Sequence, residues 1–159
     1  MNRFFTDIRQ HSIVEPASLT SGVVFALPHS GRDYGVSFLN QSILNRRSIR
    51  SSEDAFLDQL IDGIEKYGAP KIIANAPRAF IDLNRSTDEL DPALISGIKN
   101  SIKNPRVSSG LGVIPRVVAH GKEIYRGKLS FEQAQSRIGY YWKPYHKDLS
   151  DLLKRAQSI

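Results

Sequence analysis

The stretch Gly22-Val23-Val24-Phe25-Ala26-Leu27-Pro28-His29-Ser30-Gly31 joins an apolar run to a polar ending. Residues 22–27 are typical of a buried β-strand, and a histidine and a glycine follow it closely. In open α/β sheets, ligand sites form outside the carboxyl ends of the strands, and neutral imidazole binds metals or accepts protons. We therefore expect His29 to lie at a strand end, as a functional residue or as a turn histidine bonded to the backbone.

The next segments favour a parallel sheet. Residues 51–67 place apolar side chains at helical spacing, with Ser51 as the capping residue and Gly68 as the end of the pattern. The apolar face consists of Phe56, Leu57, Leu60, Ile61, Ile64 and Tyr67. Residues 71–75 predict the next strand. A strand, a helix and a strand in this order indicate a parallel α/β pair.

Other segments carry weaker or different patterns. Residues 1–20 look irregular, and residues 80–83 suggest a short extended piece. Residues 117–125 predict a β-hairpin with a tight turn. From Ser130 onward a capping box precedes a long amphipathic helix, which Pro144 should kink or split.

Length and composition indicate one domain, residues 1–159, with a single core. No apolar run approaches the roughly 20 residues of a membrane helix, and the first ten residues lack the apolar core of a signal peptide. The chain has no cysteine, which excludes disulfides and thiolate zinc sites. We therefore expect a cytoplasmic protein with no membrane partner.

The net charge of +6 raises the question of nucleic-acid binding. The basic residues are spread along the chain, and no basic run is interleaved with aromatic residues, so we expect no nucleic-acid partner. Several arginines stand singly beside Pro, Asn or Gly in predicted loops. Such arginines suit the recognition of an anion at a pocket, although a solvated basic surface is the better explanation for any single one of them.

Three groups of residues could carry chemistry: His29, the Glu53-Asp54 pair and the segment of residues 82–85. A hydrolytic zinc site needs about three N or O ligands and an open position for water. His29 could be one ligand and Asp54 or Glu53 a second. The third would have to be His120, His146 or a residue outside this chain.

The segment Asp82-Leu83-Asn84-Arg85 has two interpretations. In one, Asp82 caps a turn and Arg85 pairs with it. In the other, Asn84 and Arg85 present donors to a substrate carboxylate, and Arg85 acts as a clamp that orients the substrate.

Six short motifs in order give the chain a resemblance to a known family. They are Pro28-His29-Ser30-Gly31, Ser52-Glu53-Asp54, Pro77-Arg78-Ala79-Phe80-Ile81-Asp82-Leu83-Asn84-Arg85, Gly110-Leu111-Gly112-Val113-Ile114-Pro115-Arg116, Ile124-Tyr125-Arg126-Gly127-Lys128-Leu129 and Pro144-Tyr145-His146. Together they resemble the N-formylglutamate amidohydrolase (N-formylglutamate deformylase) family, over residues 22–155.

The resemblance implies an α/β, three-layer phosphorylase/hydrolase-like fold related to zinc carboxypeptidases. It implies zinc-dependent hydrolysis of a small-molecule N-formyl or N-acyl amino acid such as N-formylglutamate, in histidine degradation. His29 would be a metal ligand, with Asp54 or, less readily, Glu53 as the acidic ligand. The resemblance also implies substrate-binding residues: Asn84 and Arg85 for a carboxylate, and Arg116 and Arg126 as anion-binding or carbonyl-polarising residues.

Two departures from the family pattern qualify this expectation. The family has Tyr-Pro where this chain has Tyr34-Gly35. Its members also continue beyond the matched motifs with a strand that bears a further metal histidine, and the general base has no match here. We therefore expect an amino-terminal portion of the domain, truncated at the C-terminus, that associates into homo-oligomers through an unpaired sheet edge or an apolar helix face. The alternative is a catalytically incomplete fragment or a carboxylate-binding module.

Overall fold

The computed structural model describes residues 7–98 and 104–159. Its strands are β1 (His11–Val14), β2 (Phe25–Leu27) and β3 (Lys71–Ala74). Its α-helices are α1 (Val36–Leu39), α2 (Arg46–Ile49), α3 (Leu57–Leu60), α4 (Pro105–Ser108), α5 (Phe131–Arg137) and α6 (Lys143–Ala156). Short 3-10 turns lie at Arg50–Ser52, Ile64–Tyr67 and Ala119–Gly121.

The sheet has three strands in the order β1-β3-β2. Strands β2 and β3 are parallel, with Ala26 opposite Ile72, which confirms the parallel pair predicted from the sequence. Strand β1 runs antiparallel to β3, with His11 opposite Ala74, so the expectation of an irregular segment over residues 1–20 is wrong there. A segment of four residues is too short for its own apolar and polar pattern to identify a strand, and its hydrogen bonds to β3 decide its conformation.

The carboxy-terminal helical segment begins as predicted. Ser130 Oγ accepts a hydrogen bond from the Gln133 N–H at 3.1 Å, and Gln133 Oε1 accepts one from the Ser130 N–H at 2.9 Å. The interruption expected at Pro144 takes the form of a π-helical stretch over Ile138–Trp142. Proline lacks the N–H that would reach the Tyr140 carbonyl, and the Gln10 side chain donates to that carbonyl instead, at 2.6 Å.

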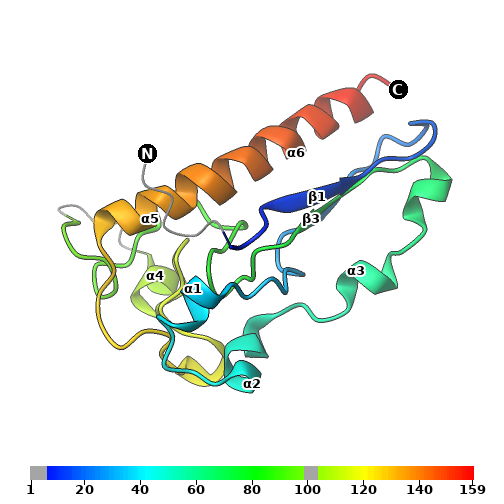
Figure 1. The fold of residues 1–159 in the computed structure, drawn as a ribbon. Helices are drawn as coiled ribbons and strands as arrows, with labels where there is room; N and C mark the ends of the chain where they lie inside the picture. The colour runs from blue at the N-terminus through cyan, green and yellow to red at the C-terminus, as the bar shows by residue number, and fades with distance from the viewer. Residues whose placement is uncertain (1–6, 99–103) are drawn as a thin grey trace.

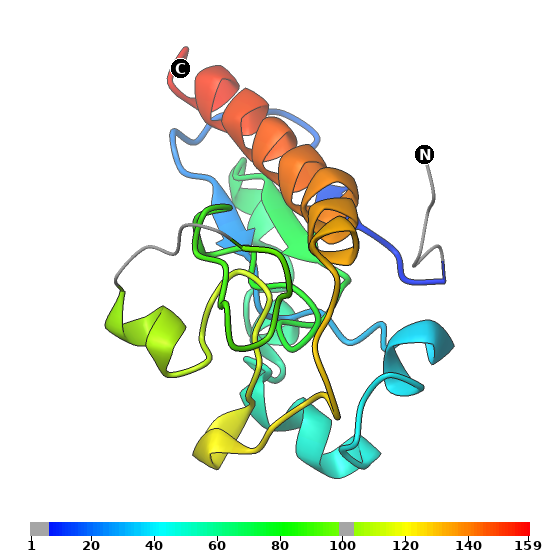
Figure 2. The same ribbon diagram turned by 90° about the vertical axis from the view of Figure 1, so that its left-hand side faces the viewer.

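Helix α6 runs beside the three-stranded sheet (Figures 1 and 2). His11 Nε2 on β1 lies 2.8 Å from Asp148 Oδ2 on α6, and the Tyr141 hydroxyl donates to the Ile8 carbonyl at 3.0 Å. The core beneath includes Arg137, whose side chain is fully buried and donates to the Phe80 carbonyl at 2.9 Å. The described helices include none that is long and apolar enough to cross a membrane.

The predicted helix over residues 51–67 does not form as one element. Only α3 and the 3-10 turns at Arg50–Ser52 and Ile64–Tyr67 are helical, because the backbone is left-handed at Phe56 (φ 64°) and at Gly63 (φ 84°). The apolar positions do not face the core: Leu60 is 81% exposed and Tyr67 is 79% exposed. Apolar spacing predicts a helix only where the apolar face has a surface to pack against.

Of the hairpin predicted over residues 117–125, only the turn forms. Val117 and Glu123 form an isolated antiparallel bridge, and the Val118 N–H donates to the Lys122 carbonyl at 2.9 Å. The strands that the prediction placed on either side are absent from this part of the described chain. The molecule is therefore a mixed α/β domain with a small sheet and many ordered loops.

Candidate active site

The site lies where the parallel strands β2 and β3 end. His29 follows the last residue of β2 by two positions, as the sequence predicted. Its loop packs closely against the exit of β3, since a Cβ atom at Gly31 would lie 2.0 Å from the Ala76 carbonyl oxygen. The Asp33 N–H donates to the Asn75 carbonyl at 3.0 Å. Only glycine permits this approach of the two backbones.

The chain after β3 turns back and brings Asp82 to His29. The N–H groups of Phe80 and Ile81 donate to the Pro77 carbonyl, so the chain turns over residues 77–81, and the extended piece expected over residues 80–83 is not a strand. Asp82 Oδ1 then lies 2.8 Å from His29 Nε2, and both residues are buried. A carboxylate only accepts hydrogen bonds, so Nε2 carries a proton, and in the tautomer that binds a metal Nδ1 offers its lone pair.

Asp54 stands at the other nitrogen of the ring. Its Oδ2 atom lies 3.5 Å from His29 Nδ1, and its side chain is 47% exposed. The Asp54 N–H donates to the His29 carbonyl at 3.2 Å, which links the two segments through the backbone. The structure thus brings together two of the predicted ligands, one imidazole and one accessible carboxylate.

Asp82 is the centre of a hydrogen-bond cluster. Besides His29, it accepts from Arg78 Nε at 3.0 Å and from the Asn84 N–H at 2.9 Å, and Arg85 Nε lies 4.0 Å away. Burial raises the pKa of Asp82, but the hydrogen bond to His29, the positive charge of Arg78 and the Asn84 N–H outweigh burial and hold the pKa below 3.8. The carboxylate is therefore ionised at neutral pH.

Trp142, the last residue of the π-helical stretch, and His146 on α6 fix the loop that follows Asp82. Trp142 Nε1 donates to the Arg85 carbonyl at 2.7 Å, and His146 Nε2 lies 2.8 Å from the Leu83 carbonyl oxygen. The two rings are stacked with centroids 3.8 Å apart. His146 thus bonds to a backbone carbonyl and does not join His29. Over residues 7–98 and 104–159, no group of three or more His, Cys, Asp or Glu side chains could hold a metal ion.

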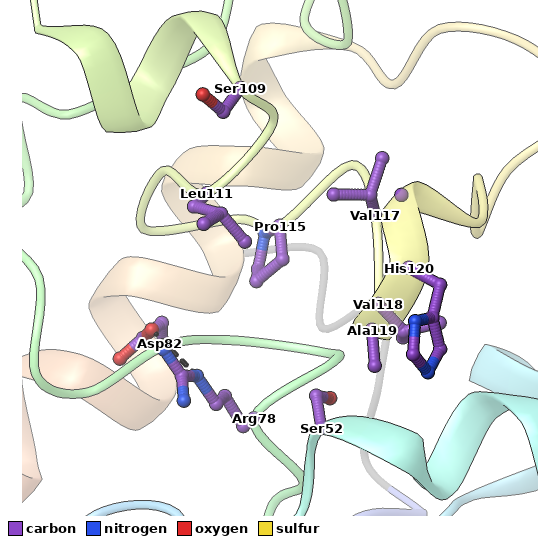
Figure 3. Close-up of a pocket in the computed structure, with 11 residues that line it drawn as sticks. Ser52, Arg78, Asp82, Ser109, Leu111, Pro115, Val117, Val118, Ala119 and His120 are labelled. Carbon is purple, nitrogen blue, oxygen red and sulfur yellow. Dashed lines mark hydrogen bonds and ion pairs between the residues drawn. The ribbon is translucent and has the colours of Figure 1, made fainter.

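A hollow of about 500 Å³ opens beside this cluster (Figure 3). Arg78 and Asp82 form one part of its lining, and the 3-10 turn that carries His120 forms another. The remaining lining residues are small, polar or apolar: Ser52, Ser109, Leu111, Pro115, Val117, Val118, Ala119 and Gly121. A small molecule in this hollow would lie against the cationic Arg78 and an apolar wall.

The other predicted site residues lie in different surroundings. The Glu53 side chain pairs with Arg50 at 3.0 Å and is 4% exposed. Burial, followed by the nearby Glu53, raises the pKa of Tyr34. The Glu53 carboxylate thus pairs with Arg50 and lies near Tyr34, rather than beside His29.

The predicted substrate arginines divide between two places. Arg116 Nε donates to Asp91 at 2.9 Å, and Arg116 and Arg126 line a separate hollow of about 170 Å³. Arg85 lies between Asp82 and Glu89, and its Nη1 atom is 3.8 Å from Glu89 Oε1. Asn84 is exposed, and it contacts Asp82 through its backbone N–H.

Sequence reasoning missed Arg78 and gave Asp82 no place in the metal site. A signal was present, because Asp82 interrupts the apolar run of residues 80–83, and a charged residue in a buried run needs partners. A metal-binding histidine usually donates its second ring N–H to a carboxylate or a carbonyl. A buried aspartate such as Asp82 is therefore the expected partner that orients the imidazole of a candidate metal ligand.

Comparisons with known proteins agree with the resemblance. The family model for N-formylglutamate amidohydrolase matches residues 21–159. N-formylglutamate deformylase of Pseudomonas aeruginosa is 23% identical over 138 residues, which cover 86% of this chain and 47% of that protein. The Pseudomonas putida N-formylglutamate deformylase is 26% identical over 137 residues, or 85% of this chain and 46% of its own.

A solved structure shows the same fold. The crystal structure of N-formylglutamate amidohydrolase from Ralstonia eutropha JMP134 matches with a TM-score of 0.86 and 28% identity, over 94% of this chain and 53% of that one. The chain spans about half the length of the relatives that it matches. From the family match and the shared fold, the chain belongs to the N-formylglutamate amidohydrolase family.

Proposed function

We propose that the chain acts in the metal-dependent hydrolysis of an N-formyl or N-acyl amino acid such as N-formylglutamate. The observation that carries the proposal is the arrangement around His29, with Asp82 on Nε2 at 2.8 Å and Asp54 near Nδ1 at 3.5 Å. The two Pseudomonas relatives are named N-formylglutamate deformylases. Histidine degradation, a cytoplasmic location, a zinc-carboxypeptidase relation, truncation of the domain and self-association remain predictions.

The residues present fit part of a metal site. His29 Nδ1 offers a lone pair, Asp82 fixes the ring through the other nitrogen, and Asp54 offers an accessible carboxylate. A bound Zn²⁺ ion would lower the pKa of a water molecule and polarise a carbonyl group. Among the described residues, we assign neither a third protein ligand nor a general base.

Arg78 is the arginine best placed to act on the substrate. Its Nε is held by Asp82 at 3.0 Å, and its side chain lines the hollow, which leaves the terminal guanidinium nitrogens for an anionic oxygen. We assign Arg78 the carbonyl-polarising role for which the sequence offered Arg116 and Arg126. Asn84 and Arg85 keep the role of carboxylate clamp that the resemblance implies.

The second candidate function is a carboxylate-binding module without catalysis. It is favoured by the finding that the described residues hold no group of three side chains able to bind a metal. Such a module would bind N-formylglutamate through its arginines and would release no formate. Turnover therefore separates the two candidates.

Release of formate from N-formylglutamate, measured with and without added Zn²⁺, tests the proposed activity. We expect Zn²⁺-dependent hydrolysis that falls by about a hundredfold or more in His29→Ala, since a first ligand is lost. The matched control is His11→Gln, because His11 bonds to Asp148 on α6 and its loss should leave turnover near that of the unaltered chain. Binding of N-formylglutamate with no formate released under any metal condition would contradict catalysis and support the binding module.

A further inference from the structure

His120 has a backbone conformation that side chains other than glycine rarely adopt. Its φ angle is 61°, and that of Gly121 is 67°. Among the described residues, Phe56 is the one other non-glycine residue with a positive φ. The left-handed conformation crowds the Cβ atom of an L-residue, whereas glycine adopts it freely. A histidine here calls for an explanation beyond the turn itself.

The turn holds His120 in a fixed place at the hollow. The Val118 N–H donates to the Lys122 carbonyl at 2.9 Å, and Val117 and Glu123 form a bridge below the tip. The His120 side chain is exposed and lines the hollow of about 500 Å³ that Arg78 and Asp82 also line. Figure 3 shows His120 on its own turn and the Arg78–Asp82 pair on another segment.

The charged and ionisable side chains of this hollow differ in whether they can contact a ligand. Its ionisable lining residues, within the described chain, are Arg78, Asp82 and His120. Asp82 already accepts hydrogen bonds from His29 and Arg78. Arg78 and His120 are thus the groups that can face an anion. The lining also includes an apolar set: Leu111, Pro115, Val117, Val118 and Ala119.

We propose that His120 binds the side-chain carboxylate of an acidic N-acyl amino acid and thereby makes the hollow selective for diacids. The inference rests on the proposed function, which places the reacting amide near His29 and Arg78. The methylene groups of a glutamate-like side chain then lie against the apolar lining, and the terminal carboxylate accepts a hydrogen bond from the imidazole. An uncharged side chain of the same length gains only the apolar contact.

The charge of the imidazole gives this role a pH signature. Arg78 and Asp82 share the hollow with His120, and Lys122 and Glu123 belong to its own turn. A protonated imidazole makes a charge-assisted hydrogen bond, which is stronger than a neutral one. The preference for the diacid should therefore be stronger at acidic than at alkaline pH, because acid favours the charged form of an imidazole. A purely structural role for His120 would leave that preference unchanged.

Isothermal titration calorimetry of the full chain with N-formylglutamate and N-formylglutamine, at about pH 6 and about pH 8, tests the proposal. At the lower pH, His120→Gly and His120→Asn should each raise the Kd for N-formylglutamate by about ten- to a hundredfold, as expected for one charge-assisted hydrogen bond. The Kd for N-formylglutamine should change by less than about threefold. Both replacements suit a left-handed position, so the fold is kept. Lys122→Ala, a charge removed from the same turn, is the matched control.

The outcomes separate the proposal from the proposed function. Equal weakening of both ligands, no weakening of either, or an effect of Lys122→Ala as large as that of His120→Gly would overturn the role of His120, whatever the formate assay shows. A selective, pH-dependent loss in the two His120 variants supports that role even if no formate is released. Failure of the unaltered chain to bind either ligand would overturn both the role and the substrate assignment.

Discussion

Asp82→Asn should lower the free energy of unfolding by about 2–3 kcal/mol at pH 7, because it weakens charge-assisted hydrogen bonds to His29 and Arg78 within a buried cluster. The Asp82 carboxylate is 3% exposed and accepts from three donors. Urea unfolding followed by circular dichroism measures the difference. Asp88→Asn, at an exposed carboxylate, is the matched control and should change the free energy of unfolding by less than about 0.5 kcal/mol.

The loss should depend on pH in a direction fixed by the lowered pKa of Asp82. A carboxyl group whose pKa is lower in the folded state stabilises the fold above its unfolded pKa, near 3.9. This contribution disappears as pH falls through the folded value. The gap between Asp82→Asn and the unaltered chain should therefore stay constant from about pH 5 to pH 8 and narrow below about pH 4. A gap that widens in acid would contradict the role given to Asp82.

Arg78→Ala should reduce kcat/KM for formate release by about a hundred- to a thousandfold. The expected size is that of removing one preorganised donor to a developing oxyanion. Arg78→Lys should recover part of the loss, since lysine keeps the charge but lacks the Nε–H that bonds to Asp82. Steady-state formate release with each variant measures both effects.

Arg126→Ala is the matched control for Arg78→Ala, because Arg126 lines the separate hollow of about 170 Å³. We expect its kcat/KM to stay within about threefold of the unaltered value, since it touches none of the groups around His29. A larger loss in Arg126→Ala than in Arg78→Ala would restore the assignment made from the sequence. It would also remove Arg78 from the reaction.

The sequence predicted the parts of the fold that are coded locally. Strands β2 and β3 and the capping box at Ser130 follow from short patterns of apolar and polar residues. Strand β1 was missed because its four residues acquire their role from a register with β3, more than 50 positions away. The helix over residues 51–67 was overpredicted because left-handed residues at Phe56 and Gly63 break it. Such backbone choices depend on tertiary contacts.

The sequence pointed to His29 and Asp54 as neighbours in a candidate site, but it did not predict their surroundings. The position of His29 after a strand and that of Asp54 downstream were visible in the sequence, and the structure brings them within 3.5 Å. The bond from His29 to Asp82 joins residues 53 positions apart, so spacing carries no sign of it. The placement of Arg78 in the hollow, and of Arg116 in another, depends on how the loops after β3 fold.

A Zn²⁺ titration of the chain, followed by ¹⁵N NMR of the histidine rings, tests the central claim most directly. The four histidines can be assigned by substitution. We predict that Zn²⁺ moves the Nδ1 signal of His29, leaves its Nε2–H bonded to Asp82, and binds more weakly in Asp54→Asn. Coordination through Nε2 with loss of the bond to Asp82, or a response at other histidines with none at His29, would contradict it.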